Sequence, residues 1–214
     1  KFGYFISFSG PDGVGKSTLV DVLNKILFEV GITDKKIPDH LLSENAPALH
    51  RSIFAKKSRS NQAYNKPYAS KPVSYFESFF RTCYYFVIFV YDGFLIFKRK
   101  RNNNIVIYDR YIMDFAVDTR RMRIKMPEIL STLFLKLLNF DNFNILIIAE
   151  VNQILERKDE LDKNQLDYLL SRYINLSNLS ESSIIFSNSK GLEQSQKDFL
   201  GLIFNKLNSH YSNY

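Results

Sequence analysis

The segment GPDGVGKS, which begins at Gly10, carries residue types at a spacing suited to holding phosphate groups. The pattern G-x-x-x-x-G-K-[ST] is matched by Gly10, Gly15, Lys16 and Ser17. Gly13 and Gly15 let the backbone turn with its amide groups inward and approach phosphates closely. Lysine at this position reaches the β- and γ-phosphates, and the next hydroxyl ligates Mg²⁺. A glycine turn without a ligand is the alternative, but a preceding strand and a following helix favour a nucleotide site.

A second candidate element is IVIYDRY, at 105–111, an apolar strand that ends in a carboxylate and a guanidinium. A carboxylate in this place supplies the Mg²⁺ contact opposite the phosphate loop, so Asp109 is the metal candidate, acting through a water molecule. Arg110 follows directly and is predicted to point into the same crevice, where its planar fork can bridge two phosphate groups. A surface Asp-Arg pair that merely ends a strand is the alternative; the phosphate loop favours function.

Strands and helices must alternate along the chain to position these groups. Apolar, β-branched runs predict strands at 4–9, 105–108, 145–149 and 183–187. Helical spacing predicts helices at 17–30, 74–100, 111–122, 128–139, 152–160, 164–179 and 192–207. The alternation predicts a three-layer α/β P-loop NTPase fold, with a mainly parallel sheet, helices on both faces and ligands at the carboxyl ends of the strands.

Length and composition predict one folded domain over residues 1–214, since 45% of residues are hydrophobic and 24% charged. Residues 34–73 carry little periodicity and are interpreted as a long loop on the acceptor side. The net charge of +7 fits a phosphate-rich partner or reflects compositional bias. The apolar run at 82–97 is interrupted by Asp92 and Gly93, which favours a core helix over a membrane span. Cys83 is the only cysteine, which suits a reducing cytoplasm, and its aromatic neighbours predict a buried, inert thiol.

The combination of GPDGVGKST and VIYDRY resembles the thymidylate kinases, a branch of the nucleoside monophosphate kinases. The resemblance covers most of the chain, but only these two motifs are specific. It implies transfer of the γ-phosphate of ATP to dTMP or a relative, with ATP and Mg²⁺ as the required cofactors. The single cysteine, the interrupted apolar run and the predicted core aromatics favour a cytoplasmic protein without a specific nucleic-acid or membrane partner. A homodimer is a further possibility, with the aromatic helix at 74–97 as its interface.

The resemblance implies roles for individual residues. Asp12 lies near the acceptor, Arg110 bridges the donor and acceptor phosphates, and a mobile lid at 152–175 brings Arg157 toward the donor. The set of implied catalytic residues is Lys16, Asp12, Arg110 and Arg157, and the metal ligands are Ser17 and Asp109. The set of implied nucleotide contacts is Gly10, Asp12, Gly13, Val14, Gly15, Lys16, Ser17, Thr18, Asn188 and Lys190. Arg172 and Tyr173 match a later helix of the lid region. For the ERKDE segment at 156–160, a solvated, salt-bridged helix face is an equal alternative.

The sequence departs from the family on the acceptor side. Asp114 stands where the family has Ser, and Val117-Asp118 replace Tyr-Gln. The family carries an arginine for the acceptor phosphate after its own second strand. The corresponding segment here, 36–44, has no arginine, and Arg51 and Arg81 are possible substitutes. An acidic-then-basic helix carries Asp114, Asp118, Arg120 and Arg121. Acceptor binding and a plain amphipathic surface are both open for this helix.

Three classes of function follow. The first is an ATP-dependent nucleoside monophosphate kinase. The second is a kinase of a sugar or another alcohol on the same fold, with Asp12 or Asp114 as the base for the hydroxyl proton. The third is a nucleotide-binding module without kinase activity. A GTPase switch is not favoured, because no Asn-Lys-x-Asp segment follows a strand, and the aromatic residues are predicted to be core rather than a nucleic-acid surface.

Overall fold

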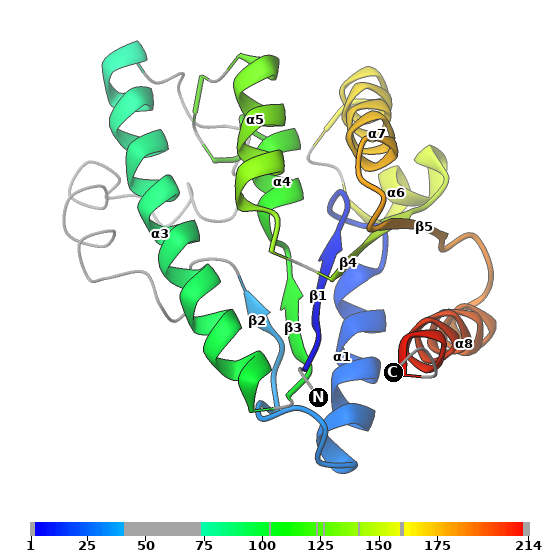
Figure 1. Cartoon of the computed structure of the whole chain (residues 1–214). Coiled ribbons are helices and arrows are strands. Elements are labelled where there is room, and N and C mark those ends of the chain that lie inside the picture. The colour runs from blue at the N-terminus through cyan, green and yellow to red at the C-terminus, as the bar shows by residue number, and fades with distance from the viewer. Residues whose placement is uncertain are drawn as a thin grey trace.

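The computed structural model describes residues 3–40, 74–102, 104–122, 124–125, 127–140, 142–158 and 161–211. Its strands are β1 (Phe5–Ser9), β2 (Asp39–His40), β3 (Val106–Asp109), β4 (Phe143–Ile148) and β5 (Ser183–Ser187). Its helices are α1 (Lys16–Glu29), α3 (Tyr75–Arg101), α4 (Ile112–Val117), α5 (Glu128–Leu138), α6 (Val151–Arg157), α7 (Lys163–Asn178) and α8 (Leu192–Tyr211) (Figure 1). The predicted loop at 34–73 is described up to residue 40, and its remainder lies outside the described residues.

The five strands form one parallel sheet in the order β2-β3-β1-β4-β5. From β1 the chain runs to the β2 edge, returns to β3 beside β1, and then crosses to β4 and β5 on the other side. The direction of winding therefore reverses around β1. Ligands of open α/β sheets bind outside the carboxyl ends of the strands at such a reversal. The sheet confirms the predicted α/β fold class.

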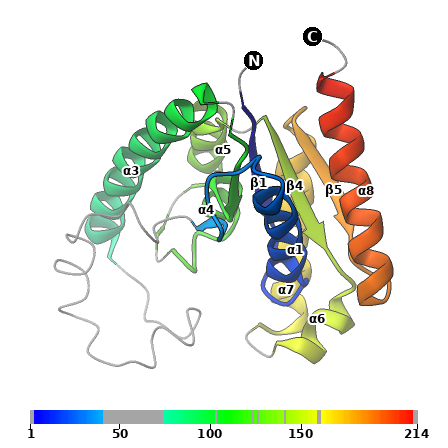
Figure 2. The same cartoon turned by 90° about the horizontal axis from the view of Figure 1, so that it is seen from below.

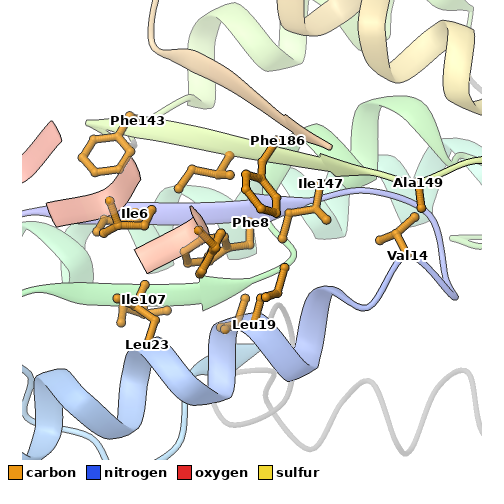
Figure 3. Close-up of a cluster of buried hydrophobic side chains, with 14 of the residues drawn as sticks. Ile6, Phe8, Val14, Leu19, Leu23, Ile107, Phe143, Ile147, Ala149 and Phe186 are labelled. Atoms are coloured by element: carbon orange, nitrogen blue, oxygen red, sulfur yellow. The ribbon is translucent and has the colours of Figure 1, made fainter. Parts of the chain in front are cut away.

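Helices cover both faces of the sheet (Figures 1 and 2). On β1, Ile6 and Phe8 point to one face, where they pack with α1 through residues such as Leu23 (Figure 3). Phe5 points to the opposite face and packs with Phe89 of α3. This alternation follows from the two-residue period of a strand. Apolar residues stand at both faces, so a buried parallel strand and a helix layer on each side are the expected result.

Helix α3 has one face in the core and one face in solvent. Tyr85, Phe89 and Ile96 pack against the sheet side, whereas Phe94 is 64% exposed and Val87 65% exposed. Among the described residues, α3 alone is long and apolar enough to cross a membrane by length and composition; its most apolar window has a mean hydropathy of 1.4 and is 33% buried. The prediction of a core helix is therefore correct for one face of α3 only, because aromatic residues occur on both the buried and the exposed face.

Two local predictions are wrong, and one strand was missed. Cys83 is exposed, not buried. It lies two residues before the buried Tyr85, and two residues along a helix bring a side chain to nearly the opposite side. The helix predicted at 111–122 ends at Val117, because Asp118 accepts the backbone N–H of Arg121 at 3.1 Å and forms a turn. Strand β2 was not predicted, since two residues carry no readable period; it is a short edge strand beside β3.

Candidate functional site

The phosphate loop joins β1 to α1, at the carboxyl end of the strand where the winding reverses. Gly13 and Gly15 have φ of 88° and 82°, a region that favours glycine. A Cβ at Gly15 would come within 2.5 Å of Nδ2 of Asn188, so a side chain there would force Asn188 to shift. Helix α1 begins at Lys16 without a side-chain cap. Its first backbone N–H groups and its dipole therefore suit an anion.

Lys16, Ser17 and Asp109 meet in front of this loop. The Lys16 ammonium forms an ion pair with Oδ1 of Asp109, and both side chains are 4% exposed. The Ser17 hydroxyl donates to Oδ2 of Asp109 at 3.0 Å. Burial and the charge of Arg110 lower the pKa of Lys16, although the carboxylates of Asp109 and Asp114 oppose this. The predicted phosphate lysine and the two predicted metal ligands thus lie together.

Asp12 lies among three cations from different parts of the chain. Arg110, directly after β3, pairs with Oδ1 of Asp12, and Arg121, after α4, pairs with Oδ2. Lys158, at the end of α6, places its Nζ 3.8 Å from Oδ2. Burial alone would raise the pKa of Asp12, but the charges of Arg110, Arg121 and Lys158 lower it overall. The carboxylate is therefore held ionised at the edge of the phosphate loop.

Asp114 anchors the other side of Arg110. Its Oδ1 accepts from Nη1 of Arg110 at 3.4 Å, from the hydroxyl of Tyr173 at 2.8 Å and from the backbone N–H of Gly10 at 3.3 Å. Asp114 is 1% exposed, and its Oδ2 has no hydrogen-bond partner within the part of the chain that the structure describes. Burial and the charge of Asp114 raise the pKa of Tyr173 well above its ordinary value. This network joins α4 and α7 to the start of the phosphate loop.

Arg110 has φ of 75°, the one non-glycine residue with a positive φ among those described. Its backbone N–H donates to the carbonyl of Phe8 at 2.9 Å, which holds it beside β1. Burial would lower the pKa of Arg110, but the carboxylates of Asp114 and Asp12 raise it further above its ordinary value. A backbone conformation of this kind costs about 1–3 kcal/mol and persists where the surroundings fix it, typically at functional sites.

The predicted nucleotide contacts on the β5 side are partly assembled. Asn188, directly after β5, is buried and donates to the carbonyl of Val14 at 2.6 Å. Nη1 of Arg157 donates to the carbonyl of Gly13 at 3.2 Å. Lys190 instead pairs with Asp198 at 2.7 Å, so it does not reach the loop. Thr18 is exposed on α1.

One feature of the site was not identified from the sequence. Arg121 and Lys158 converge on Asp12 from turns whose course the sequence does not reveal. Of the two possible substitutes for the missing acceptor arginine, Arg51 lies outside the described residues. Arg81 is buried in a 2.8 Å ion pair with Glu77 on its own helix. The acidic-then-basic run that contains Arg121 and the ERKDE segment that contains Lys158 were the sequence signals for this convergence.

The carboxylate of Asp12 predicts a pH dependence of stability. Its pKa is lower in the folded protein than in the unfolded chain, where it is about 3.9. The unfolded state therefore takes up the proton first, so the contribution is fully present above about pH 5 and is lost as the pH falls through the lowered pKa of the folded state. Urea unfolding at stepped pH values should show a shallower acid loss for Asp12→Asn than for the wild type. Equal losses would contradict this assignment.

No family model matches the sequence, and no curated protein matches it. Among solved structures, the chain is similar to the thymidylate kinase from Candida albicans, with a TM-score of 0.66 and 15% identity over 97% of this chain and 93% of that chain. It is also similar to the thymidylate kinase from Ehrlichia chaffeensis, with a TM-score of 0.61 and 12% identity over 95% of this chain and 99% of that chain. The chain therefore has, over most of its length, the P-loop fold of the thymidylate kinases.

Proposed function

We propose that this protein is an ATP-dependent kinase that transfers the γ-phosphate of ATP to a nucleoside monophosphate, with dTMP as the first candidate. The carrying observation is the meeting of Lys16, Ser17 and Asp109 at the winding reversal of the sheet. In this proposal residues 1–214 act as one cytoplasmic domain. The fold shared with two thymidylate kinases supports the choice of acceptor class.

The residues present fit MgATP. Mg²⁺ is held in kinases by one or two carboxylates or hydroxyls together with substrate phosphates, and Ser17 Oγ and Asp109 Oδ2 offer such oxygens 3.0 Å apart. The bound ion neutralises negative charge on the phosphates. Lys16 would leave Asp109 for the phosphates and hold them as a cation. Gly13, Gly15 and the start of α1 would supply backbone N–H groups.

Arginines complete the proposed machinery. Arg110 lies between the phosphate loop and Asp114, where a planar guanidinium can contact both the donor and the acceptor. The lid is proposed within 152–175, where α6 ends and α7 begins, and Arg157 is its donor-side cation. Tyr173 is fully buried, so the later part of this segment stays anchored while the earlier part closes. The remaining proposed donor contacts are Gly10, Val14, Thr18, Asn188 and Lys190.

The geometry favours a phosphorylated acceptor over an alcohol. An alcohol acceptor needs a base with a pKa near the working pH, whereas the cations around Asp12 lower its pKa. Asp114 is buried and its Oδ1 faces Gly10, Arg110 and Tyr173 rather than open space. A phosphate acceptor needs no such base, because its oxygen is already a nucleophile at neutral pH. Catalysis then rests on positioning and on charge neutralisation.

The test is ATP consumption with Mg²⁺ across dTMP, dUMP, other nucleoside monophosphates and then sugars. A broad panel is appropriate, because the Candida albicans enzyme is described as having broad substrate specificity. Turnover on one or more nucleoside monophosphates supports the proposal. ATP binding with turnover on sugars alone would replace it with an alcohol kinase. ATP binding without turnover on any acceptor would leave a nucleotide-binding module.

We further propose that α3 forms a homodimer through its exposed apolar face. The residues of this face recur at alternating spacings of four and three: Phe76, Phe80, Cys83, Val87, Val90, Phe94 and Phe97. This is the spacing that packs one helix along another, and the face carries no charge. The other face of α3 packs in the core, which favours a protein partner over a membrane span. An uncharged apolar helix face can pack against the same face of a second copy of the chain.

Val87→Glu is expected to weaken the dimer by at least about 100-fold, because it places an unpaired carboxylate in an apolar interface. Sedimentation at stepped concentrations measures the effect. Leu179→Glu, the same kind of change at an exposed residue outside α3, is the control. The thiol of Cys83 should react slowly in the wild-type dimer and faster in Val87→Glu. A wild-type protein that stays monomeric at tens of micromolar would contradict the proposal.

A further inference from the structure

The cations around Asp12 carry an inference about the acceptor. Arg110 pairs with one carboxylate oxygen of Asp12, and Arg121 pairs with the other. Lys158 adds a third cation from α6, 3.8 Å from that second oxygen. Arg110 and Arg121 flank α4, Lys158 follows α6, and all three converge on a planar anion with two oxygens. Two guanidinium forks and an ammonium around one anion are the arrangement that binds a phosphate group.

Arg121 is both held in place and reachable. Its backbone N–H donates to Oδ1 of the buried Asp118 at 3.1 Å, and Asp118 in turn donates its own backbone N–H to the carbonyl of Asp114 at 2.9 Å. The turn after α4 is thereby tied to the same residue that anchors Arg110. The side chain of Arg121 remains 27% exposed, whereas that of Arg81 is 8% exposed and bound to Glu77. Arg121 is paired with Asp12, but of these two arginines it is the more accessible to a ligand.

The position of Arg121 is on the acceptor side of the phosphate loop. The donor-side contacts, Asn188 and Arg157, reach the carbonyls of Val14 and Gly13. Arg121 reaches the loop from the turn after α4, and helix α4 lies on the other side of β1 from α8 (Figures 1 and 2). In the proposed function, the donor would therefore meet Asn188 and Arg157, and the acceptor would meet Arg121.

We propose that Arg121 binds the phosphate of the acceptor, in place of the arginine missing after the second strand. The inference rests on the proposed function and names a residue that binds its acceptor. Asp12 holds the cations in the empty protein, and the acceptor phosphate takes over Arg121 and shares Arg110. An oxygen of that phosphate forms the new bond to the γ-phosphorus. The bond from the γ-phosphorus to the bridging oxygen of ATP breaks, and its electron pair leaves with ADP.

Calorimetric binding of dTMP and of thymidine to Arg121→Ala tests the proposal, with Arg120→Ala as the neighbouring control. Loss of a charge-assisted, two-pronged contact is expected to weaken dTMP binding about 10- to 100-fold. Arg121→Lys should recover part of this loss, because it restores the charge without the fork. The affinities for MgATP and thymidine should stay within about twofold, since neither uses the Arg121 contact. Unchanged dTMP binding, or equal losses for dTMP and thymidine, would overturn the role.

A second arm does not depend on the identity of the acceptor. Inorganic phosphate is titrated with a non-hydrolysable ATP analogue and Mg²⁺ already saturating the donor site. The wild type should bind phosphate, and Arg121→Ala should bind it at least about 10-fold more weakly. No phosphate binding to the wild type, or equal binding to both proteins, would overturn the inference. If the wild type binds phosphate but no nucleoside monophosphate, the nucleotide acceptor is wrong and Arg121 still holds a phosphorylated one.

Discussion

Replacing Lys16 with alanine is expected to lower phosphoryl transfer by about 1,000-fold or more, because a preorganised cation at the transferred phosphate is among the largest catalytic contributions. Lys16 begins α1 directly after the loop, and it is 4% exposed beside Asp109 at the end of β3. Its charge is isolated from water, so bulk ions cannot replace it. The measurement is the steady-state rate with saturating MgATP and the best acceptor from the panel.

The same change has a structural consequence that must be separated from catalysis. Removing Lys16 leaves Asp109 buried without its ion-pair partner, which costs about 3–5 kcal/mol when nothing compensates. The Ser17 hydroxyl still donates to Asp109, so the loss should fall at the lower end. Urea unfolding of Lys16→Ala reports this cost. Lys25→Ala, on an exposed part of the same helix, is the control for α1 and should change neither property. Near-normal turnover by folded Lys16→Ala would contradict the role of Lys16.

Features set by neighbouring residues were predictable from the sequence. The loop needs glycine at positive φ, lysine at the helix start and a hydroxyl next to it, and all of these lie within one short segment. The alternation of apolar strands and amphipathic helices likewise predicts a parallel sheet with two helix layers. Each of these patterns is local, so no knowledge of distant contacts was needed. The fold is therefore readable even though identity to the similar kinases is 12–15%.

Features set by distant contacts were not predictable. The end of α4 is an exception, because it is set locally: Asp118 accepts the backbone N–H of Arg121 three residues on, where the polar pattern alone continues the helix. Lys158 approaches Asp12 only because α6 returns over the phosphate loop. The exposure of Cys83 depends on which side of α3 meets the sheet, and aromatic residues occupy both sides. The type of a residue determines what chemistry its side chain can do, but the packing of separate segments determines which side chains meet in one site.

Replacing Arg110 is expected to lower the rate constant of transfer by about 1,000-fold, while the affinity of the free protein for MgATP changes little. An arginine that stabilises charge on the moving phosphoryl is worth about 10³ to 10⁵ in rate. Arg110 lies between Asp12 and Asp114, and its side chain is 16% exposed, so it is partly shielded from solvent. Loss in the rate constant with little loss in donor binding is the signature of a contact made in the transition state.

The positive φ of Arg110 gives a way to separate this catalytic loss from loss of stability. Arg110→Ala and Arg110→Gly both remove the guanidinium and leave Asp114 without one of its donors. Glycine accepts the backbone conformation, so Arg110→Gly should unfold at higher urea than Arg110→Ala, by about 1 kcal/mol of stability. If Arg110 acts on the reacting phosphates, both variants lose the same activity despite this difference. Arg110→Lys keeps the charge but not the fork, so its activity should lie between those of the wild type and Arg110→Gly. Activity that instead rises with stability from Ala to Gly would make Arg110 a residue that shapes the loop, with the charge neutralisation supplied by Lys16 and the lid.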